Sequence, residues 1–244
     1  MLKAFAITDV GRKRQLNEDF VCAKTEKVGA LPNFFIIADG MGGHKAGDRA
    51  SKETVEIMLD SLAKSESPNP KEALEDALKT ANLKVFQDAS ASEELEGMGT
   101  TVVAATILGR KLCVMNVGDS RLYVISQGRI CQITMDHSLV EEMVRKGVLP
   151  REKARNHPKK NIITRAVGVS PIVEPDFFEV ELKAGDIVLM CSDGLSNMLE
   201  DEELRGIADS IGSLGEKARL MIDAANVNGG KDNISVILIE IPAE

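Results

Sequence analysis

The sequence predicts an α+β fold in which two antiparallel β-sheets pack face to face and helices cover both outer faces. Three observations favour this four-layer fold. Most runs rich in Val, Ile and Phe follow one another at hairpin spacing, which argues against a doubly wound parallel sheet. Segments of helical period stand before and after the main group of strands. Helices in these two places can cover the two faces of a sandwich.

The expected strands are apolar runs bounded by Gly, Asn and Asp. Tight turns at Gly109-Arg110 and Gln127-Gly128 predict that residues 100–134 form a meander. Strands are predicted near residues 3–9, 20–24, 33–38, 100–108, 111–117, 121–126, 129–134, 186–191 and 234–241.

Helices are predicted where apolar residues recur with a helical period. Segments 46–64 and 70–90 are separated by Pro68 and Pro70, so we expect an antiparallel helix pair. Shorter helices are predicted at 138–147, 200–210 and 214–226. No linker or repeat divides residues 1–244. The stretch 144–161 is crowded with Lys and Arg and is interpreted as a mobile basic excursion.

Composition and charge restrict the class of protein. With 43% hydrophobic and 28% charged residues, the chain of 244 residues has the composition of a folded, water-soluble protein. Its apolar runs, such as 34–38, are far shorter than the roughly 18 residues that cross a bilayer. Residues 4–7 are too short for a secretory signal, so a cytoplasmic location is expected.

Nucleic acid is not an expected partner. The net charge is −8, and the chain has no Trp and one Tyr on which bases could stack. The four cysteines are widely spaced, each in an apolar run, so we expect buried free thiols. They are Cys22, Cys113, Cys131 and Cys191.

Four aspartates stand where apolar runs end or begin. Asp39, Asp119 and Asp193 follow such runs, and Asp232 opens the last one. Each is also typical of an ordinary turn when taken alone. Together they can meet at one rim of a sheet, where carboxylates would repel one another unless a cation lay between them. Oxygen ligands without supporting His or Cys favour Mg²⁺ or Mn²⁺.

The sequence lacks the motifs of several other catalytic mechanisms. The chain has no Asp-x-Asp of an aspartyl nucleophile and no Cys with Arg six residues on, as in cysteine phosphatases. It also lacks a nucleotide-binding P-loop, a dinucleotide fingerprint and a Gly-x-Ser-x-Gly elbow. Of the mechanisms considered, only the activation of water by a metal ion is compatible with the sequence.

Motifs distributed over nearly the whole chain resemble the protein phosphatase 2C (PPM) family of metal-dependent serine/threonine phosphatases, in its compact bacterial form. Each motif is weak alone, but their order is specific. They are Asp9-Val10-Gly11, Arg14-Gln15-Leu16-Asn17-Glu18-Asp19, Asp39-Gly40-Met41-Gly42-Gly43-His44, Gly97-Met98-Gly99-Thr100-Thr101, Gly118-Asp119-Ser120-Arg121, Asp136-His137-Ser138, Thr164-Arg165-Ala166, Ser192-Asp193-Gly194-Leu195 and Gly230-Lys231-Asp232-Asn233.

The resemblance implies one catalytic domain over residues 1–244, with a flap-like excursion near 140–166. It also implies a site for two Mn²⁺ or Mg²⁺ ions, with a hydroxide between them as nucleophile, and a third, weaker ion in bacterial members. Carried over by position, the site residues are Asp39 as the bridge between both ions, Asp193 and Asp232 on the first, the Gly40 carbonyl and Glu18 on the second, Asp119 with Asp193 on the third, and Arg14 as the phosphate clamp.

The general acid is not assigned by the resemblance. The eukaryotic pattern has a His two residues after the bridging Asp, whereas this chain has Met41 there. His44 either forms a structural hydrogen bond or donates a proton, and His137 is expected to support a turn. A metal-bound water could replace such an acid.

The implied activity is hydrolysis of phosphoserine and phosphothreonine in proteins, opposing a bacterial serine/threonine kinase, by a monomer. Two alternatives stay open. A catalytically inactive relative would only bind phosphoproteins, although all the expected metal carboxylates are present. A phosphohydrolase for small molecules would also suit the basic excursion at 144–161.

Overall fold

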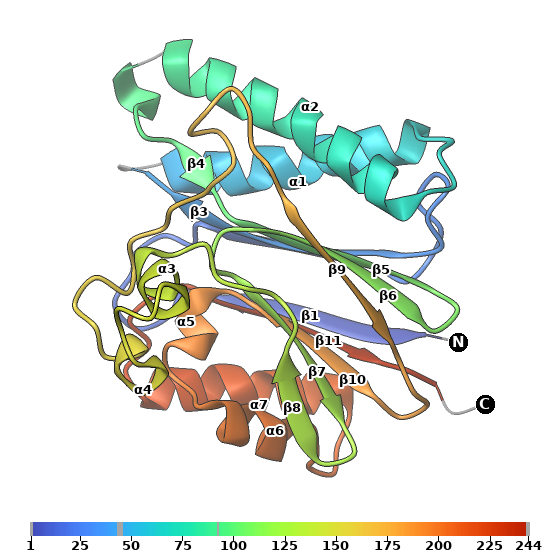
Figure 1. The fold of residues 1–244 in the computed structure, drawn as a ribbon. Helices are drawn as coiled ribbons and strands as arrows, with labels where there is room; N and C mark the ends of the chain where they lie inside the picture. The colour runs from blue at the N-terminus through green and yellow to red at the C-terminus, as the bar shows by residue number, and fades with distance from the viewer. Residues whose placement is uncertain (1, 43–45, 92, 243–244) are drawn as a thin grey trace.

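The computed structural model describes residues 2–42, 46–91 and 93–242, and Figure 1 shows its strands and helices. The strands are β1 Lys3–Asp9, β2 Asp19–Lys24, β3 Phe34–Met41, β4 Gly99–Thr100, β5 Val102–Leu108, β6 Lys111–Val117, β7 Arg121–Ser126, β8 Arg129–Gln132, β9 Asp176–Glu181, β10 Ile187–Cys191 and β11 Ile234–Glu240. The helices are α1 Ala46–Lys64, α2 Pro70–Ala91, α3 Leu139–Arg145, α4 Arg151–Ala154, α5 Asp193–Ser196, α6 Asp201–Ala208 and α7 Leu214–Val227, with a 3₁₀ turn η1 at Glu93–Leu95.

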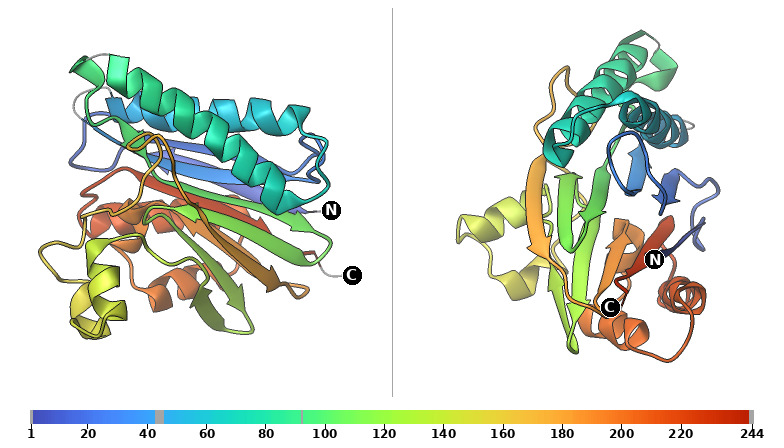
Figure 2. Two further views of the ribbon diagram at one scale, coloured as in Figure 1. Left: turned by 45° about the horizontal axis from the view of Figure 1, so that its top comes forward. Right: turned by 90° about the vertical axis from the view of Figure 1, so that its right-hand side faces the viewer.

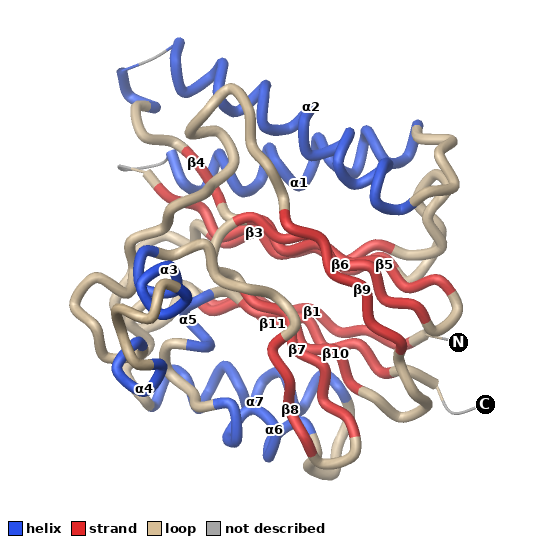
Figure 3. The backbone as a smooth tube through the Cα atoms, viewed as in Figure 1, coloured by secondary structure: helices blue, strands red, loops and turns tan. Residues whose placement is uncertain are grey.

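The strands form two sheets. One has the order β1-β11-β10-β7-β8, and the other has the order β2-β3-β5-β6-β9 with β4 paired to β3. Each pairing between these strands is antiparallel. Helices α1 and α2 cover the second sheet, and α6 and α7 cover the first (Figures 2 and 3). The predicted sandwich with helices on both outer faces is therefore confirmed.

Strand β3 shows why its sequence is apolar throughout. Phe34, Ile36 and Ala38 pack in the cluster beneath α1 and α2. Phe35 and Ile37, which point to the opposite face, pack between the two sheets. A strand covered on both faces has no solvent side, so it does not alternate between apolar and polar residues. Asp39 lies on this strand, directly after its buried apolar run.

The predicted strands and the five predicted helices are present, with ends shifted by a few residues. Strand β9 was not predicted. It pairs with β6 at the edge of its sheet, and acidic residues interrupt its apolar pattern. The basic excursion is anchored to α3 by an ion pair in which Arg151 of α4 donates two hydrogen bonds to the carboxylate of Glu141.

The expectation of four buried thiols is wrong for Cys131. Cys113 and Cys191 are buried and Cys22 is half-buried, whereas Cys131 is exposed. Cys131 lies on β8, an edge strand whose outward face meets solvent. All four thiols are free. Among the described residues, no helix is long and apolar enough to cross a membrane.

Candidate active site

The four predicted aspartates converge at the end of the sandwich where α5 lies, and Figure 1 shows this helix on the left. Asp39 lies near the end of β3, Asp119 follows β6, Asp193 begins α5 and Asp232 precedes β11. Burial raises the pKa of Asp39 well above its ordinary value, and the charges of Asp19, Asp193, Asp119 and Asp232 raise it further. The strand ends therefore place these carboxylates close enough for their charges to repel one another.

The carboxylates repel one another when they are ionised. Burial, reinforced by Asp232, raises the pKa of Asp193 to about 6. Burial, reinforced by Asp193, raises that of Asp119 well above its ordinary value, and the Asp119 side chain is almost enclosed at 7% exposure. Nearby cations lower the free energy of such a cluster in its charged form.

Asp19 is a fifth member that the sequence reasoning did not assign. It lies opposite Asp39 in the β2–β3 ladder and is 5% exposed. Its Oδ2 accepts hydrogen bonds from the hydroxyls of Ser192 (2.8 Å) and Ser235 (2.6 Å). Its Oδ1 is buried without a hydrogen bond from any described residue. Burial raises the pKa of Asp19 to about 7. Its place directly after Glu18 in the motif is the one signal that could have identified it.

Asp19 also joins the two sheets behind the cluster. It begins β2 of one sheet, whereas Ser192 follows β10 and Ser235 belongs to β11 of the other. The backbone N–H of Ser235 donates to the Ser192 hydroxyl at 3.0 Å. This network joins the start of β2, beside Asp39, to the end of β10, which precedes Asp193.

The donor set of the cluster fits a hard divalent cation. Among the described side chains, no three His, Cys, Asp or Glu groups are arranged as a finished metal site. The Arg14 guanidinium instead lies between Glu18 Oε2 (3.2 Å) and Asp232 Oδ2 (2.9 Å) and supplies positive charge there. The orphaned Asp19 oxygen and the clustered carboxylates are all oxygen donors, which is the chemistry of Mg²⁺ and Mn²⁺ sites.

Gly40 allows three chain segments to meet beside Asp39. Its N–H donates to the Glu18 carbonyl at 3.0 Å. A Cβ atom at Gly40 would lie 2.0 Å from the Gly47 carbonyl oxygen at the start of α1, and 2.6 Å from that of Glu18. Any side chain at this position would therefore separate β3, α1 and the Glu18 segment.

Asn233 ties the N-terminal loop to the last strand. It is 3% exposed, and its Oδ1 accepts from the Glu18 N–H at 2.8 Å. Its Nδ2 donates to the carbonyls of Val10 and Leu16, both at 2.9 Å. These bonds hold the loop that carries Arg14 and Glu18 against the residue next to Asp232.

Asn233→Ala should lower the free energy of unfolding by about 3 kcal/mol, because one buried N–H and two part-buried carbonyls would lose their partner. Urea denaturation measures this change. Asn228→Ala is the control, since Asn228 is exposed and donates one hydrogen bond, to the Met198 carbonyl. A change at Asn233 no larger than that at Asn228 would contradict the clamp.

The turn that carries Asp119 is held by His137. The His137 Nδ1 accepts from the Gly118 N–H at 3.0 Å, and its Nε2 lies 3.2 Å from Asp176 Oδ2. Nδ1 must be unprotonated to accept, so the proton of the neutral ring is on Nε2, facing Asp176. Burial lowers the pKa of His137, which keeps the ring neutral. His44 lies outside the described residues.

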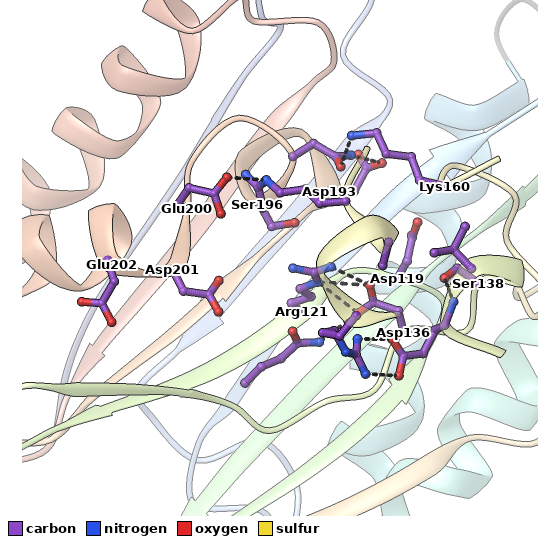
Figure 4. Close-up of a pocket in the computed structure, with 17 residues that line it drawn as sticks. Asp119, Arg121, Asp136, Ser138, Lys160, Asp193, Ser196, Glu200, Asp201 and Glu202 are labelled. Atoms are coloured by element: carbon purple, nitrogen blue, oxygen red, sulfur yellow. Dashed lines mark hydrogen bonds and ion pairs between the residues drawn. The ribbon is translucent and has the colours of Figure 1, made fainter. Parts of the chain in front are cut away.

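A cleft of about 320 Å³ opens beside the aspartates, between the α3–α4 segment and the start of α6. Asp119 and Asp193 line one part of it, and Lys160 lies close to Asp193 (Figure 4). The Lys160 ammonium donates to Asn197 Oδ1 at 2.7 Å, and Asn197 Nδ2 donates to Asp193 Oδ2 at 2.9 Å. Asn197 thus links the basic excursion to the cluster, a contact that the sequence did not indicate.

Known proteins resemble this chain over nearly its whole length. A family model described as protein phosphatase 2C matches residues 11–227. The serine/threonine phosphatase stp of Listeria monocytogenes serovar 1/2a is 41% identical over 96% of this chain and 93% of that protein. Protein phosphatase PhpP of Streptococcus pneumoniae strain R6 is 38% identical over 98% of this chain and 97% of that protein.

Solved structures agree with the sequence relatives. The serine/threonine phosphatase of S. agalactiae superposes with a TM-score of 0.92 at 37% identity, covering 99% of this chain and 100% of that one. The catalytic domain of the serine threonine protein phosphatase PstP, in complex with two manganese ions, superposes with a TM-score of 0.87 at 32% identity, covering 99% of each chain.

Proposed function

This chain belongs to the protein phosphatase 2C family, and we propose how its carboxylate cluster serves the hydrolysis of phosphoserine and phosphothreonine in proteins. Membership makes it a metal-dependent serine/threonine phosphatase. The observation that carries the proposal is the convergence of Asp39, Asp119, Asp193 and Asp232 beside the orphaned oxygen of Asp19.

Two Mn²⁺ or Mg²⁺ ions are proposed for this cluster. Asp39 would be shared by both, Asp193 and Asp232 would complete the first site, and Glu18 with the Gly40 carbonyl would serve the second. When bound, the ions lower the pKa of a water molecule and neutralise charge on phosphoryl oxygens. The manganese complex of the PstP catalytic domain, with its two ions, supports this number.

Asp39 is held for this task by the backbone around it. Its carbonyl accepts from the Thr101 N–H at 2.8 Å and from the Thr100 hydroxyl at 2.9 Å. Its own N–H donates to the Thr101 hydroxyl at 3.2 Å, and that hydroxyl is bonded to Ser120 next to Asp119. One network therefore ties the backbone of Asp39 to the residue next to Asp119.

Arg14 is proposed to bind the substrate phosphate. Although burial lowers its pKa, Asp232 and Glu18 raise it, so the guanidinium stays charged. Cations held by Asp232 and Glu18 would weaken these two ion pairs and leave the guanidinium available to the phosphate. A guanidinium can form paired hydrogen bonds to phosphate oxygens.

Arg14→Ala should raise the KM for a phosphothreonine peptide about tenfold or more, because a charge-assisted contact contributes about 1.5–3 kcal/mol. The kcat should fall less than the KM rises. Steady-state kinetics measures both, with Gln15→Ala as an exposed neighbouring control. Unchanged KM and kcat in Arg14→Ala would show that Arg14 is no phosphate clamp.

A third ion is proposed between Asp119 and Asp193. Met41 takes the place of the eukaryotic His and has no proton to give to the leaving seryl or threonyl oxygen, and an ion held by Asp119 and Asp193 would make nearby water a stronger acid for that purpose. An aryl phosphate needs this help less, because its phenolate leaves easily.

Asp119→Ala should therefore lose more activity on a phosphothreonine peptide than on an aryl phosphate, roughly 100-fold against tenfold. Calorimetry should still detect two tightly bound Mn²⁺ ions. Equal losses on both substrates with both tight sites intact would refute the leaving-group role.

We further propose that residues 1–244 act as one catalytic domain with a flap near 140–166, as a monomer that opposes a serine/threonine kinase. The deciding assay is release of phosphate from a phosphothreonine peptide with and without Mn²⁺. Binding without hydrolysis would favour an inactive phosphoprotein-binding relative. Hydrolysis of small phosphate esters alone would favour a small-molecule phosphohydrolase.

A further inference from the structure

Three exposed cations border the Arg14 side of the site, and we call Arg12, Lys13 and Lys231 the basic rim. The backbone N–H groups of Arg12 (2.7 Å) and Lys13 (3.1 Å) both donate to the Gly230 carbonyl. A Cβ atom at Gly230 would lie 2.8 Å from Arg12 Cγ. The two loops that carry the rim therefore form one continuous surface.

This surface adjoins the reaction centre. Lys13 precedes Arg14, and Lys231 precedes Asp232, the residue with which Arg14 forms an ion pair at 2.9 Å. Lys160 lies across the site, and it is close enough to Lys231 for the charge of Lys231 to lower the Lys160 pKa. Burial lowers the pKa of Lys160, and Arg155 and Lys231 lower it further, while Asp193 opposes them.

The cations of the rim have no acidic partners among the described residues. All three are exposed, and none of the ion pairs between described residues includes them. Arg155, by contrast, is paired with Glu200, and Arg205 with Glu202. The rim is thus a group of uncompensated positive charges on a chain with a net charge of −8.

The cleft on the opposite side of the site has more acidic than basic side chains in its lining, with seven carboxylates against Arg121, Arg151, Arg155 and Lys160. Glu200, Asp201 and Glu202 line the cleft beyond Asp193 (Figure 4). Asp201 forms no ion pair with a described residue, and the carboxylate of Glu202 is 75% exposed. An acidic segment of a substrate would be repelled on this side and attracted on the side of the rim.

We propose that the basic rim binds carboxylates that flank the phosphoresidue on one side, so the enzyme prefers phosphorylation sites with acidic residues on that flank. This inference rests on the proposed function, because it requires the phosphate to lie at the Arg14 site. The substrate class is an acidic phosphopeptide. Each exposed charge pair contributes about 0.2–1 kcal/mol, or up to about fivefold in affinity, and salt screens it.

The test uses the full chain with Mn²⁺ and three phosphothreonine peptides of equal length. One has neutral flanks, one has two Glu on the N-terminal side, and one has two Glu on the C-terminal side. One acidic peptide should have a kcat/KM roughly tenfold above that of the neutral peptide, through a lower KM. The preference should shrink in about 0.5 M NaCl, where the screening length is only a few ångströms.

The double variant Lys13→Glu/Lys231→Glu should remove or reverse this preference. The matched control is Arg129→Glu, an exposed cation at the far end of the β7–β8 hairpin, which should retain it. An aryl phosphate, which has no flanks, reports whether the reaction centre of each variant is intact.

Absence of any acidic preference in the wild-type enzyme, or an undiminished preference in the double variant, would overturn the inference. Both outcomes require that the aryl phosphate is still hydrolysed. If the wild-type enzyme hydrolysed neither the peptides nor the aryl phosphate, the proposed function would fail and this inference with it.

Discussion

Asp39→Asn should give a folded protein whose turnover of a phosphothreonine peptide is lower by roughly 10³-fold, equivalent to about 4 kcal/mol of transition-state stabilisation. The amide keeps the shape of the side chain but removes the charge that both proposed ions share. In metal-free protein at neutral pH the same change should raise the melting temperature, because it relieves repulsion from Asp119, Asp193 and Asp232.

Single-turnover and steady-state kinetics with saturating Mn²⁺ measure the loss, and thermal unfolding in a chelator measures the gain. Asp60→Asn is the matched control, because Asp60 is exposed on α1. A kcat within tenfold of the wild-type value would mean that Asp39 does not hold the catalytic ions. A fall in the metal-free melting temperature would contradict the repulsion within the cluster.

Chelation should abolish activity, and Mn²⁺ or Mg²⁺ should restore it. The free energy of unfolding of the metal-free protein should also fall as the pH rises from about 4 to about 7. Burial raises the pKa of Asp193 to about 6 and that of Asp19 to about 7 in the folded chain. The ordinary value, about 3.9, applies to the unfolded chain. Between these limits the folded state binds more protons, so its stability is greatest at low pH and falls as these groups ionise.

Urea denaturation at pH 5 and pH 7.5, with chelator or with Mn²⁺, tests this dependence. Chelator should lower the free energy of unfolding most at pH 7.5, and Mn²⁺ should reverse that loss. Asp19→Asn should flatten the dependence, which separates the carboxylates from His137, whose lowered pKa acts in the opposite direction. If the metal-free wild-type chain and the metal-free Asp19→Asn variant were each equally stable at pH 5 and pH 7.5, ionisation of the buried carboxylates would not destabilise the fold.

The carboxylate ends of the strands could be predicted because the signal is local. Asp39, Asp119 and Asp193 each follow an apolar run long enough to be a buried strand, and neighbouring strands of one fold often end at a common rim. The same local signal gave the helix pair and the meander. This local signal does not indicate which carboxylate oxygen forms a hydrogen bond with which other residue.

The contacts that complete the site join residues far apart in the chain. Asp19 accepts hydrogen bonds from Ser192 and Ser235, which are separated from it by 173 and 216 positions in the chain. Arg14 is separated by 218 positions from Asp232, to which it donates. The family resemblance implied a role toward phosphate for Arg14, but nothing local in the sequence indicated its ion pairs with Glu18 and Asp232. Strand β9 was missed for a related reason, because its partner β6 precedes it by about 60 residues and its solvent edge is acidic.

Calorimetric titration of metal-free protein with Mn²⁺ shows whether this carboxylate cluster holds the catalytic ions. The wild-type chain should bind two Mn²⁺ ions tightly, and Asp39→Asn should lose both tight sites because each depends on the shared carboxylate. Asp60→Asn should match the wild type. Two tight sites retained in Asp39→Asn would place the ions elsewhere and contradict the account.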